Sequence, residues 1–510
     1  MLQIRGLTII HRKDLRVLLK EFDLTLNPGE KCAVIGEEGN GKSTLLKLIY
    51  DASLVDDYVE VSGQISRNGM ILGYLPQELP KQDTERSVLD YCQQTGSFWE
   101  QSPRDLAELA GRLAFPVDLF FEDRPMGSLS GGERIKIQLA CLLMTQPDVL
   151  LLDEPSNDLD LETLEWLEAF LQTCPQAVLY ISHDETLLER TAEMVVHLEL
   201  VRRKTLPRWT VARLPYSEYV NQRLRKIDHQ TQMARREQAD YRTKMEKFRQ
   251  IQSKVEHRQR TISRQDPHGG KMLKKKMHAV QSMGKRFERE KERMTQLPDV
   301  EEAIFLRFSE NCSIPAGKVI LDLDLPYLTV GEHCLAENIR LHVEGPEKIC
   351  IIGRNGVGKT TLLKKIAEQL LPRTDLKTAY MPQNYQELLP FDLTPVEYLN
   401  RSGSREEATV IRNHLGSVKY TTQEMEHPIG EMSGGQKAKL LFIKLILDGA
   451  NVLILDEPTR NFSPLSNPVI REILQTFRGT IISVSHDRKY MEEVCDKLYG
   501  LTGEGLTRIW

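Results

Sequence analysis

The chain has 510 residues, a formal net charge of −5 and 40% hydrophobic residues. This length suits two domains of roughly 200 residues plus a connector, and the composition excludes a mainly disordered chain. No window approaches the roughly 20 apolar residues of a membrane-spanning helix, and charge interrupts the N-terminal segment too early for a signal peptide. We therefore expect a soluble, cytoplasmic protein with no membrane partner.

Five motifs occur twice in the same order. The first copies are GEEGNGKST, YLPQ, LSGGE, VLLLDEP and ISHD, and the second copies are GRNGVGKTT, YMPQ, MSGGQ, VLILDEP and VSHD. Ser130, Asp153 and His183 each precede their counterparts by 303 positions, so this part was duplicated without insertion or deletion. Self-similarity at a fixed offset indicates a repeat. We predict a first repeat at 1–215, a linker at 216–298 and a second repeat at 299–510.

Each repeat contains one phosphate loop of the pattern G-x-x-x-x-G-K-[ST]. Both loops follow apolar runs, 32–35 and 349–352, which predict buried strands, and both precede helical patterns. Glycines let backbone N–H groups point at phosphates, and the lysine and hydroxyl reach the terminal phosphates and Mg²⁺. The predicted ATP-binding residues are Gly36, Gly39, Asn40, Gly41, Lys42, Ser43 and Thr44 in the first loop, and Gly353, Asn355, Gly356, Gly358, Lys359, Thr360 and Thr361 in the second.

A pair of acids follows four apolar residues in each repeat, at Asp153-Glu154 and Asp456-Glu457. Two carboxylates at the end of a buried strand suggest a functional role. The first acid suits Mg²⁺ together with the loop hydroxyl, and the second suits orienting the attacking water. Thirty residues after each aspartate come His183 and His486, again at strand ends, where they can contact the γ-phosphate or hold that water.

The Ser-Gly-Gly segments precede helical patterns. We predict Ser130 and Ser433 as N-caps whose following amides form a second anion site. An ordinary turn with a helix cap is the alternative interpretation. The first repeat also carries about eleven extra residues near 52–68, since Lys42 and Gln77 are 35 residues apart and Lys359 and Gln383 are 24. This insertion is either a neutral elaboration or a contact arm.

With all five motifs in order, the chain resembles ATP-binding-cassette ATPases over nearly all of both repeats. The resemblance implies an α/β fold with two tandem P-loop ATPase domains joined by an α-helical hairpin. It also implies a monomer whose repeats pair head to tail, so that each ATP lies between one phosphate loop and the other repeat's signature segment, Ser130–Glu133 or Ser433–Gln436. Gln77 and Gln383 are implied as catalytic and magnesium-contacting residues.

Two composite sites follow from this pairing. The first composite site combines Lys42, Ser43, Gln77, Asp153, Glu154 and His183 with Ser433, Gly434, Gly435 and Gln436. The second combines Lys359, Thr360, Gln383, Asp456, Glu457 and His486 with Ser130, Gly131, Gly132 and Glu133. One departure concerns the D-loops, Ser156–Asp160 and Thr459–Ser466: Ser463 stands in the second where Asp160 stands in the first. Whether both sites hydrolyse ATP equally is left open by this difference.

The linker carries a strong positive charge. From 221 to 297 there are 22 Lys or Arg against 9 Asp or Glu, although the whole chain is at −5. Residues 216–263 and 271–297 predict helices, and Pro267 with Gly269 and Gly270 should break them, giving a hairpin with its tip at about 264–271. One-sided charge favours RNA over a solvated coiled-coil spacer. The predicted RNA contacts are Arg264, His268, Lys271, Lys274, Lys275 and Lys276.

Twin cassettes with a long linker and no membrane segment resemble the ABC-F subfamily. That resemblance implies binding in the tRNA exit site of the ribosome, with contacts to ribosomal RNA and the peptidyl-site tRNA. The tip loop looks more like the branch that protects translation from ribosome-targeting antibiotics. The alternatives are a housekeeping factor that relieves stalled ribosomes, the ATPase subunit of an exporter, and a DNA-associated cassette ATPase.

Overall fold

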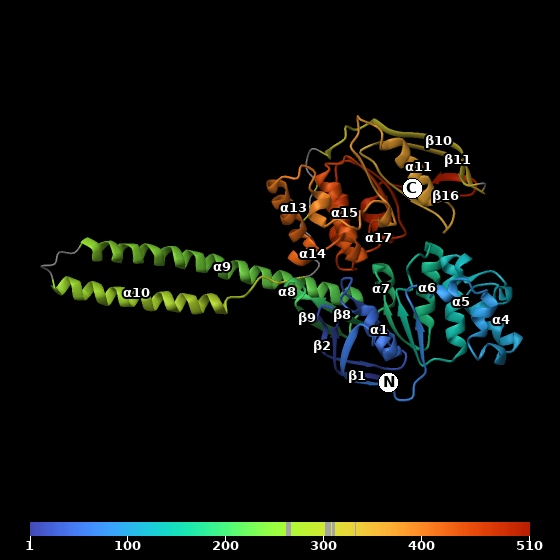
Figure 1. Ribbon diagram of the computed structural model, residues 1–510, viewed down its shortest axis with the longest axis horizontal. Helices are drawn as coiled ribbons and strands as arrows, with labels where there is room; N and C mark the ends of the chain where they lie inside the picture. The colour runs from blue at the N-terminus through green and yellow to red at the C-terminus, as the bar shows by residue number, and fades with distance from the viewer. Residues whose placement is uncertain (262–266, 301–305, 307, 309–311, 332) are drawn as a thin grey trace. The chain divides into compact units, whose positions relative to one another are not determined.

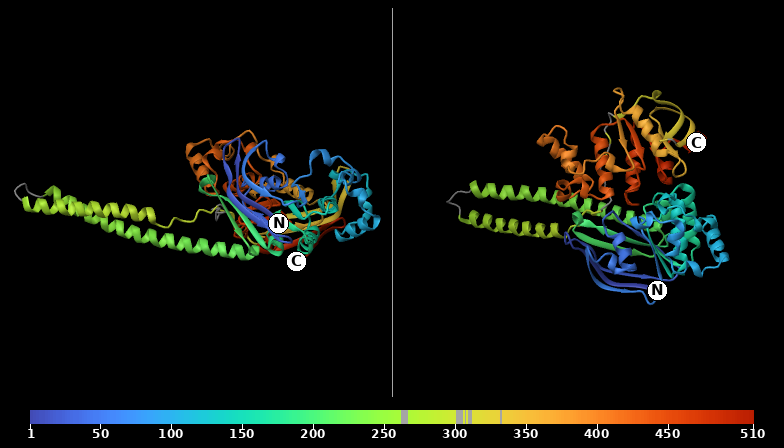
Figure 2. Two further views of the ribbon diagram at one scale, coloured as in Figure 1. Left: turned by 90° about the horizontal axis from the view of Figure 1, so that it is seen from below. Right: turned by 45° about the vertical axis from the view of Figure 1, so that its right-hand side comes forward.

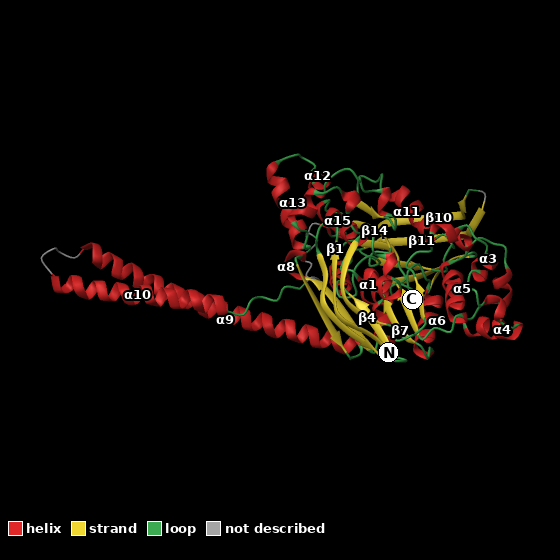
Figure 3. Ribbon diagram, turned by 60° about the horizontal axis from the view of Figure 1, so that its bottom comes forward, coloured by secondary structure: helices red, strands yellow, loops and turns green. Residues whose placement is uncertain are grey.

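The computed structural model describes residues 1–261, 267–300, 306, 308, 312–331 and 333–510. The chain divides into two compact units. One unit comprises Met1–Tyr216 and Glu301–Trp510 and holds both repeats, and the other, here called the linker unit, is Ser217–Val300. Strands gather in the repeats, whereas the linker unit is drawn as two long helices (Figures 1 and 3).

The first repeat is an α/β domain. Its strands are β1 (Leu2–His11), β2 (Val17–Leu26), β3 (Lys31–Ile35), β4 (Val59–Ser66), β5 (Leu72–Leu75), β6 (Val149–Asp153), β7 (Ala177–Ile181), β8 (Met194–Leu200) and β9 (Leu206–Ala212). Its helices are α1 (Lys42–Tyr50), α2 (Lys81–Thr84), α3 (Val88–Gln93), α4 (Pro103–Arg112), α5 (Gly131–Met144), α6 (Leu161–Thr173), α7 (Glu185–Thr191) and α8 (Val201–Lys204). The larger sheet has the order β5-β6-β7-β3-β8-β9.

The second repeat has the same architecture. Its strands are β10 (Lys318–Val330), β11 (His333–Gly345), β12 (Lys348–Ile352), β13 (Thr378–Met381), β14 (Val452–Asp456), β15 (Thr480–Val484), β16 (Lys497–Thr502) and β17 (Gly505–Arg508). Its helices are α11 (Lys359–Leu370), α12 (Pro395–Leu399), α13 (Arg405–Ser417), α14 (Thr422–Glu426), α15 (Gly434–Leu447), α16 (Asn467–Gln475) and α17 (Arg488–Val494). Its larger sheet, β13-β14-β15-β12-β16-β17, repeats the first order strand for strand.

Parallel pairing places the motif-bearing ends of the strands at one edge of each sheet. β3 pairs parallel with β7, and β7 with β6; β12, β15 and β14 repeat this arrangement. The central strands β6 and β7 are buried along their whole length, as expected for parallel strands covered on both faces. The carboxyl ends of these strands lead directly into the phosphate loops, the paired acids and the histidines. The predicted α/β class with two tandem domains is confirmed.

The extra residues of the first repeat build a strand. β4 lies within the 52–68 insertion and pairs antiparallel with β1, placing Val61 opposite Ile9. The small sheet of the first repeat therefore has the order β2-β1-β4, whereas the corresponding sheet of the second repeat is β10-β11. The insertion extends a sheet, which gives it a structural role.

The linker unit is an antiparallel helical hairpin. Its helices are α9 (Tyr216–Thr261) and α10 (Pro267–Arg293), which run side by side in the views of Figures 1 and 2. Phe287 of α10 packs edge-on against Phe248 of α9, with ring centroids 5.5 Å apart. Near the other end, the Glu237 carboxylate accepts a hydrogen bond from the Thr295 backbone N–H at 2.6 Å.

The second helix begins earlier than its sequence indicates. α10 starts at Pro267 and includes Gly269 and Gly270, so the prediction that these residues break the helix up to 271 is wrong. Proline has no N–H to donate and its fixed φ suits the first helical position, where it starts a helix rather than ending one. Among the described residues, no helix has both the length and the apolar character needed to span a membrane.

Candidate functional site

The two phosphate loops adopt the same conformation. Gly41 and Gly358 cap helices α1 and α11 at φ values of 84° and 100°, in the left-handed region that favours glycine. A Cβ on Gly36 would lie 2.2 Å from the Leu198 carbonyl oxygen, so this position also requires glycine. The predicted strand–loop–helix context is confirmed in both repeats, with β3 and β12 before the loops.

Both loop lysines fold over their own loops. The Lys42 ammonium donates to the carbonyls of Gly36 and Glu37 at 2.8 and 3.0 Å. The Lys359 ammonium makes the equivalent bonds to Gly353 and Arg354, also at 2.8 and 3.0 Å. A concave loop with inward N–H groups and a buried ammonium at its centre is a phosphate-binding arrangement. Asn40, which is buried, anchors the first loop by donating to the Leu198 carbonyl at 3.0 Å.

The first acid of each pair lies beside the loop hydroxyl. The Ser43 hydroxyl donates to Asp153 Oδ1 at 2.9 Å. Burial raises the pKa of Asp153 to about 6, although Ser43 opposes this shift. Asp456 is hydrogen-bonded by Thr360, while its Oδ2 atom is buried without a hydrogen-bond partner. Hydroxyl and carboxylate oxygens are the ligands that Mg²⁺ prefers, and an orphaned carboxylate oxygen fits a cation site. These residues therefore fit Mg²⁺.

In the first repeat, the second acid is held on both oxygens. His183 Nε2 lies 3.0 Å from Glu154 Oε1, and Asn157 donates to Glu154 Oε2 at 2.6 Å. His183 Nδ1 donates to the Phe462 carbonyl of the other repeat at 2.8 Å. Burial would raise the pKa of Glu154, but His183 outweighs it and the pKa falls to about 2. Glu154 is thus a carboxylate already paired with an imidazolium.

In the second repeat, the equivalent acid lies farther from its histidine. His486 Nε2 lies 3.8 Å from Glu457 Oε1. Burial, with Asp456 beside it, raises the pKa of Glu457 to about 8, and burial together with Lys359 lowers that of His486 to about 4. Both groups are therefore neutral near pH 7, and their contact is not an ion pair. Arg460 stands at the position equivalent to Asn157 and instead pairs with Asp158 at 2.8 Å.

Both signature segments start helices as predicted. Ser130 caps α5 by accepting from the Glu133 N–H, and the Glu133 side chain returns to the Ser130 N–H. Ser433 and Gln436 form the same capping box at α15. The glycine after Ser130 is needed, since a Cβ on Gly131 would lie 2.4 Å from the Asp158 carbonyl oxygen. The N-cap prediction is confirmed for both serines.

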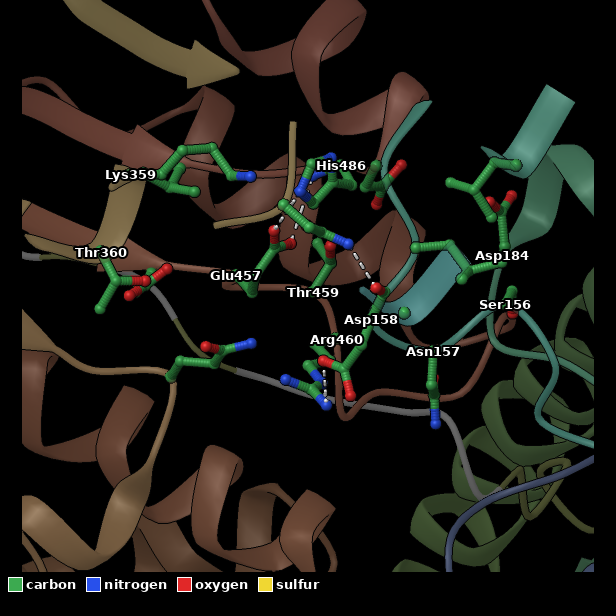
Figure 4. A pocket seen from close by; sticks show the side chains of 18 of the residues that line it. Ser156, Asn157, Asp158, Asp184, Lys359, Thr360, Glu457, Thr459, Arg460 and His486 are labelled. Carbon is green, nitrogen blue, oxygen red and sulfur yellow. Dashed lines mark hydrogen bonds and ion pairs between the residues drawn. The ribbon is translucent and has the colours of Figure 1, made fainter. Parts of the chain in front are cut away.

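One cavity of about 480 Å³ has walls from both repeats. The second repeat contributes Lys359, Thr360 and Glu457, and the first repeat contributes Gly131 and the segment 156–159. In Figure 4, Lys359, Glu457 and His486 lie on one side of the pocket, and Ser156, Asn157 and Asp158 lie on the other. The cavity lining also includes Gly356, Gly358, Thr361, Gln383, Asp456 and His183. The second phosphate loop thus lies opposite the first signature segment.

The first phosphate loop meets the second signature segment. Glu38 accepts a hydrogen bond from the Gly435 N–H at 2.5 Å, and Lys439 of α15 pairs with Glu37 at 2.7 Å. Gln77 and Gln383 follow β5 and β13, where Gln77 is exposed and Gln383 half-buried. Sequence reasoning missed Glu37, Lys439 and Asn157 as site residues. Comparing each motif with its repeat copy would have marked Glu37 and Asn157, because Arg354 and Arg460 stand at the equivalent positions. Lys439 has a lysine, Lys136, at its equivalent position, so this comparison gives no signal for it.

The predicted RNA contacts lie in the linker unit. Lys271, Lys274, Lys275 and Lys276 are exposed on the first turns of α10. Arg264 and the side chain of His268 lie outside the described residues.

A family model described as ABC transporter matches residues 19–157 and 336–460, which is just over half of the chain. The chain therefore belongs to the ABC transporter family, whose domains bind and hydrolyse ATP. Over its whole length it is similar to members of sub-family F. The probable ATP-binding protein YheS of Escherichia coli K12 is 28% identical, covering 96% of this chain and 77% of that protein. Human ATP-binding cassette sub-family F member 3 is 27% identical, covering 97% and 70%.

Solved structures share the fold. A crystal structure of an archaeal ribosome recycling factor bound to a ribosomal stalk protein superposes with a TM-score of 0.61, at 17% identity, over 99% of this chain and 90% of that one. At this identity the likeness concerns the fold of the paired repeats alone.

Proposed function

We propose that this chain is an ABC-F ATPase that binds the ribosome and acts on it through the linker unit. The observation that carries this proposal is a hairpin with a surplus of 13 positive charges between two paired ATPase repeats. A polyanion is the partner that such a surface recognises. The archaeal recycling factor that shares this fold is described in complex with a ribosomal stalk protein. That description supports the ribosome as the target of this chain.

ATP binding and hydrolysis are the source of movement in this proposal. Each nucleotide lies between one phosphate loop and the opposite signature segment, so that binding closes the two repeats and hydrolysis releases them. Lys42 and Lys359 hold the terminal phosphates, while Glu154 and Glu457 orient the attacking water, with His183 and His486 beside them. Both composite sites lie within one chain, so the active form is a monomer.

The magnesium-binding residues are those whose oxygens already converge. Ser43 and Asp153 in the first site, with Thr360 and Asp456 in the second, hold the cation, and Gln77 and Gln383 complete its surroundings. When bound, Mg²⁺ neutralises charge on the transferring phosphoryl group. The side chains of the protein align the water and phosphate, and this alignment is the main contribution that a protein makes to phosphoryl transfer.

The linker unit contacts folded RNA in this proposal. The exposed lysines at the start of α10 reach phosphates of ribosomal RNA and of the peptidyl-site tRNA from the tRNA exit site, in the cytoplasm. The outcome of binding is protection of translation from ribosome-targeting antibiotics. Similarity to YheS and sub-family F member 3 along the whole chain keeps a second candidate, a housekeeping factor that relieves stalled ribosomes.

Trapping the closed form tests ribosome binding. The Glu154→Gln/Glu457→Gln variant with ATP should co-sediment with ribosomes in a sucrose gradient, and the Lys42→Ala/Lys359→Ala variant should remain at the top. If the glutamine variant sediments free of ribosomes, the proposal fails. Drug susceptibility with and without the gene, across macrolides, lincosamides, pleuromutilins and phenicols, then separates protection from the housekeeping role. Unchanged susceptibility to all four classes contradicts protection.

A further inference from the structure

The first phosphate loop carries two acidic residues where the second carries none. Glu37 and Glu38 occupy the positions that Arg354 and Asn355 occupy in the second loop. Acids are unexpected in a loop that binds polyphosphate, because like charges repel at short range. Both side chains turn away from their own loop and contact the other repeat. Their function must therefore be sought at the boundary between the repeats.

Glu37 is held by three donors of the second repeat. Its Oε1 atom accepts from the hydroxyls of Ser463, at 2.6 Å, and Ser466, and its Oε2 atom pairs with the Lys439 ammonium at 2.7 Å. Glu37 and Lys439 are only 8% and 9% exposed. Burial would raise the pKa of Glu37, but Lys439 and the two hydroxyls outweigh burial and lower it to about 2. The carboxylate is therefore charged and fully partnered.

Glu38 occupies an anion position at a helix start. Its carboxylate accepts from the Gly435 N–H at 2.5 Å, in the first turn of α15. The amides at this end of a helix favour negative charge. Asn355, the equivalent residue of the second loop, instead donates to the Asp158 carbonyl at 2.6 Å. Thus a side chain of the protein already supplies an anion to the second signature segment.

The replacement of the D-loop aspartate by Ser463 is consistent with the acids Glu37 and Glu38 on the facing phosphate loop. In the second composite site, Asp160 lies on the D-loop side and its Oδ2 accepts from the Asn355 N–H at 3.5 Å. In the first composite site, the acid is on the phosphate loop as Glu37, and a serine hydroxyl replaces the D-loop acid. An aspartate at 463 would place two carboxylates against each other in a buried site. The acid is therefore on the phosphate loop in the first site, as Glu37, and on the D-loop in the second, as Asp160.

We propose that Glu37 and Glu38 form a nucleotide-independent latch that holds the first phosphate loop against the second signature segment. Ser463 is the D-loop residue that makes this latch possible. The first composite site therefore stays closed between cycles, and the second, with its open cavity, carries the opening that nucleotide controls. Glu37 acts as a positioning residue, because it fixes the two halves of the first site without touching the reacting atoms. The latch depends on the pairing of the repeats and not on the proposed ribosomal target.

Hydrogen exchange of the full chain, freed of nucleotide and Mg²⁺, tests the latch site by site. In the wild type, amides in peptides 36–42 and 433–439 should exchange about tenfold more slowly than those in peptides 353–359 and 130–136, because a buried ionic contact must open first. A non-hydrolysable ATP analogue should protect mainly the second pair of peptides. Equal exchange at both sites in the nucleotide-free protein overturns the proposal.

Three variants separate the latch from a general loss of folding. Glu37→Gln should remove most of the tenfold difference, and Ser463→Asp should remove it as well. Glu37→Lys combined with Lys439→Glu should restore slow exchange, since the ion pair is re-formed and the serine hydroxyls can also accept from lysine. Arg354→Gln, at the equivalent position of the second loop, is the matched control and should change neither pair of peptides. Slow exchange retained in Glu37→Gln overturns the proposal, and so does failure of the charge swap in a protein with wild-type circular dichroism.

Discussion

Arg471 of α16 forms a two-pronged ion pair with Glu185 of α7, across the boundary between the repeats. Its Nη1 and Nη2 atoms lie 2.5 and 3.2 Å from the two carboxylate oxygens, and the side chains are only 4% and 6% exposed. The position equivalent to Glu185 in the second repeat is Arg488, which pairs with Glu168 of the first repeat. Opposite charges at equivalent positions favour pairing of unlike repeats over pairing of two copies of the same repeat.

Replacing Arg471 should destabilise the paired repeats strongly. Arg471→Met leaves the buried Glu185 carboxylate with only Lys489 at 3.3 Å, and removing one partner of a buried pair costs about 3 to 5 kcal/mol. We expect a clearly lower midpoint of urea unfolding. Arg354→Met is the control, because its pair with Glu162 is 79% and 74% exposed and should contribute about 1 kcal/mol or less. Recovery in Arg471→Met/Glu185→Met would confirm that the stranded charge causes the loss.

Glu37 should make stability depend on pH in the acid range. Its pKa is about 2 in the folded chain against 4.5 for the free side chain, so its contribution is present above pH 4.5 and is lost as the pH falls towards 2. The shift corresponds to about 3 kcal/mol. Urea unfolding at a series of pH values should show the gap between wild type and Glu37→Gln shrinking over this window. A gap that does not change with pH would contradict the assignment.

The two phosphate loops should bind one nucleotide each. Lys42→Ala and Lys359→Ala each remove the buried ammonium from one loop, so equilibrium dialysis with labelled ATP and Mg²⁺ should find the stoichiometry falling from two to one in either variant. The double variant should bind none. Unchanged stoichiometry in a single variant would show that the altered loop holds no nucleotide in the wild type.

The two glutamates should contribute unequally to turnover. Glu154 is already engaged by His183 and Asn157, whereas Glu457 has its histidine at 3.8 Å and remains available to water. Above a pH of about 8, where Glu457 is ionised, we expect Glu457→Gln to lower kcat about 100-fold, in the usual range for a lost general base, and Glu154→Gln to lower it only a few-fold. Steady-state phosphate release measures both. Equal losses would show that ATP binding makes the two sites alike.

The lysines at the start of α10 should account for part of the salt dependence of RNA binding. Replacing Lys271, Lys274, Lys275 and Lys276 by Gln should flatten the plot of log affinity against log salt by about 0.7 to 0.9 for each phosphate that is no longer neutralised by a lysine. The control replaces Lys285, Arg286, Arg289 and Lys291, which are exposed further along the same helix. Filter binding to ribosomal RNA measures both slopes. An equal change in the control would place the RNA-binding surface along the whole hairpin.

Local pattern accounts for much of the fold and of the site. Strand–loop–helix order, the N-caps at Ser130 and Ser433 and the acids after β6 and β14 depend on residues near in sequence, and all were predicted. The start of α10 was missed because Pro267 can begin a helix as well as end one. The contacts of Glu37 were missed for a different reason. Lys439 is 402 positions away, and only the pairing of the repeats brings them together.

The second D-loop also contacts the first residue of the linker helix. Next to Ser463, the Pro464 carbonyl accepts a long hydrogen bond of 3.4 Å from the hydroxyl of Tyr216, where α9 begins. At 46 residues, α9 is about 69 Å long. One degree of rotation about Tyr216 would displace the far end of a helix of this length by about 1 Å.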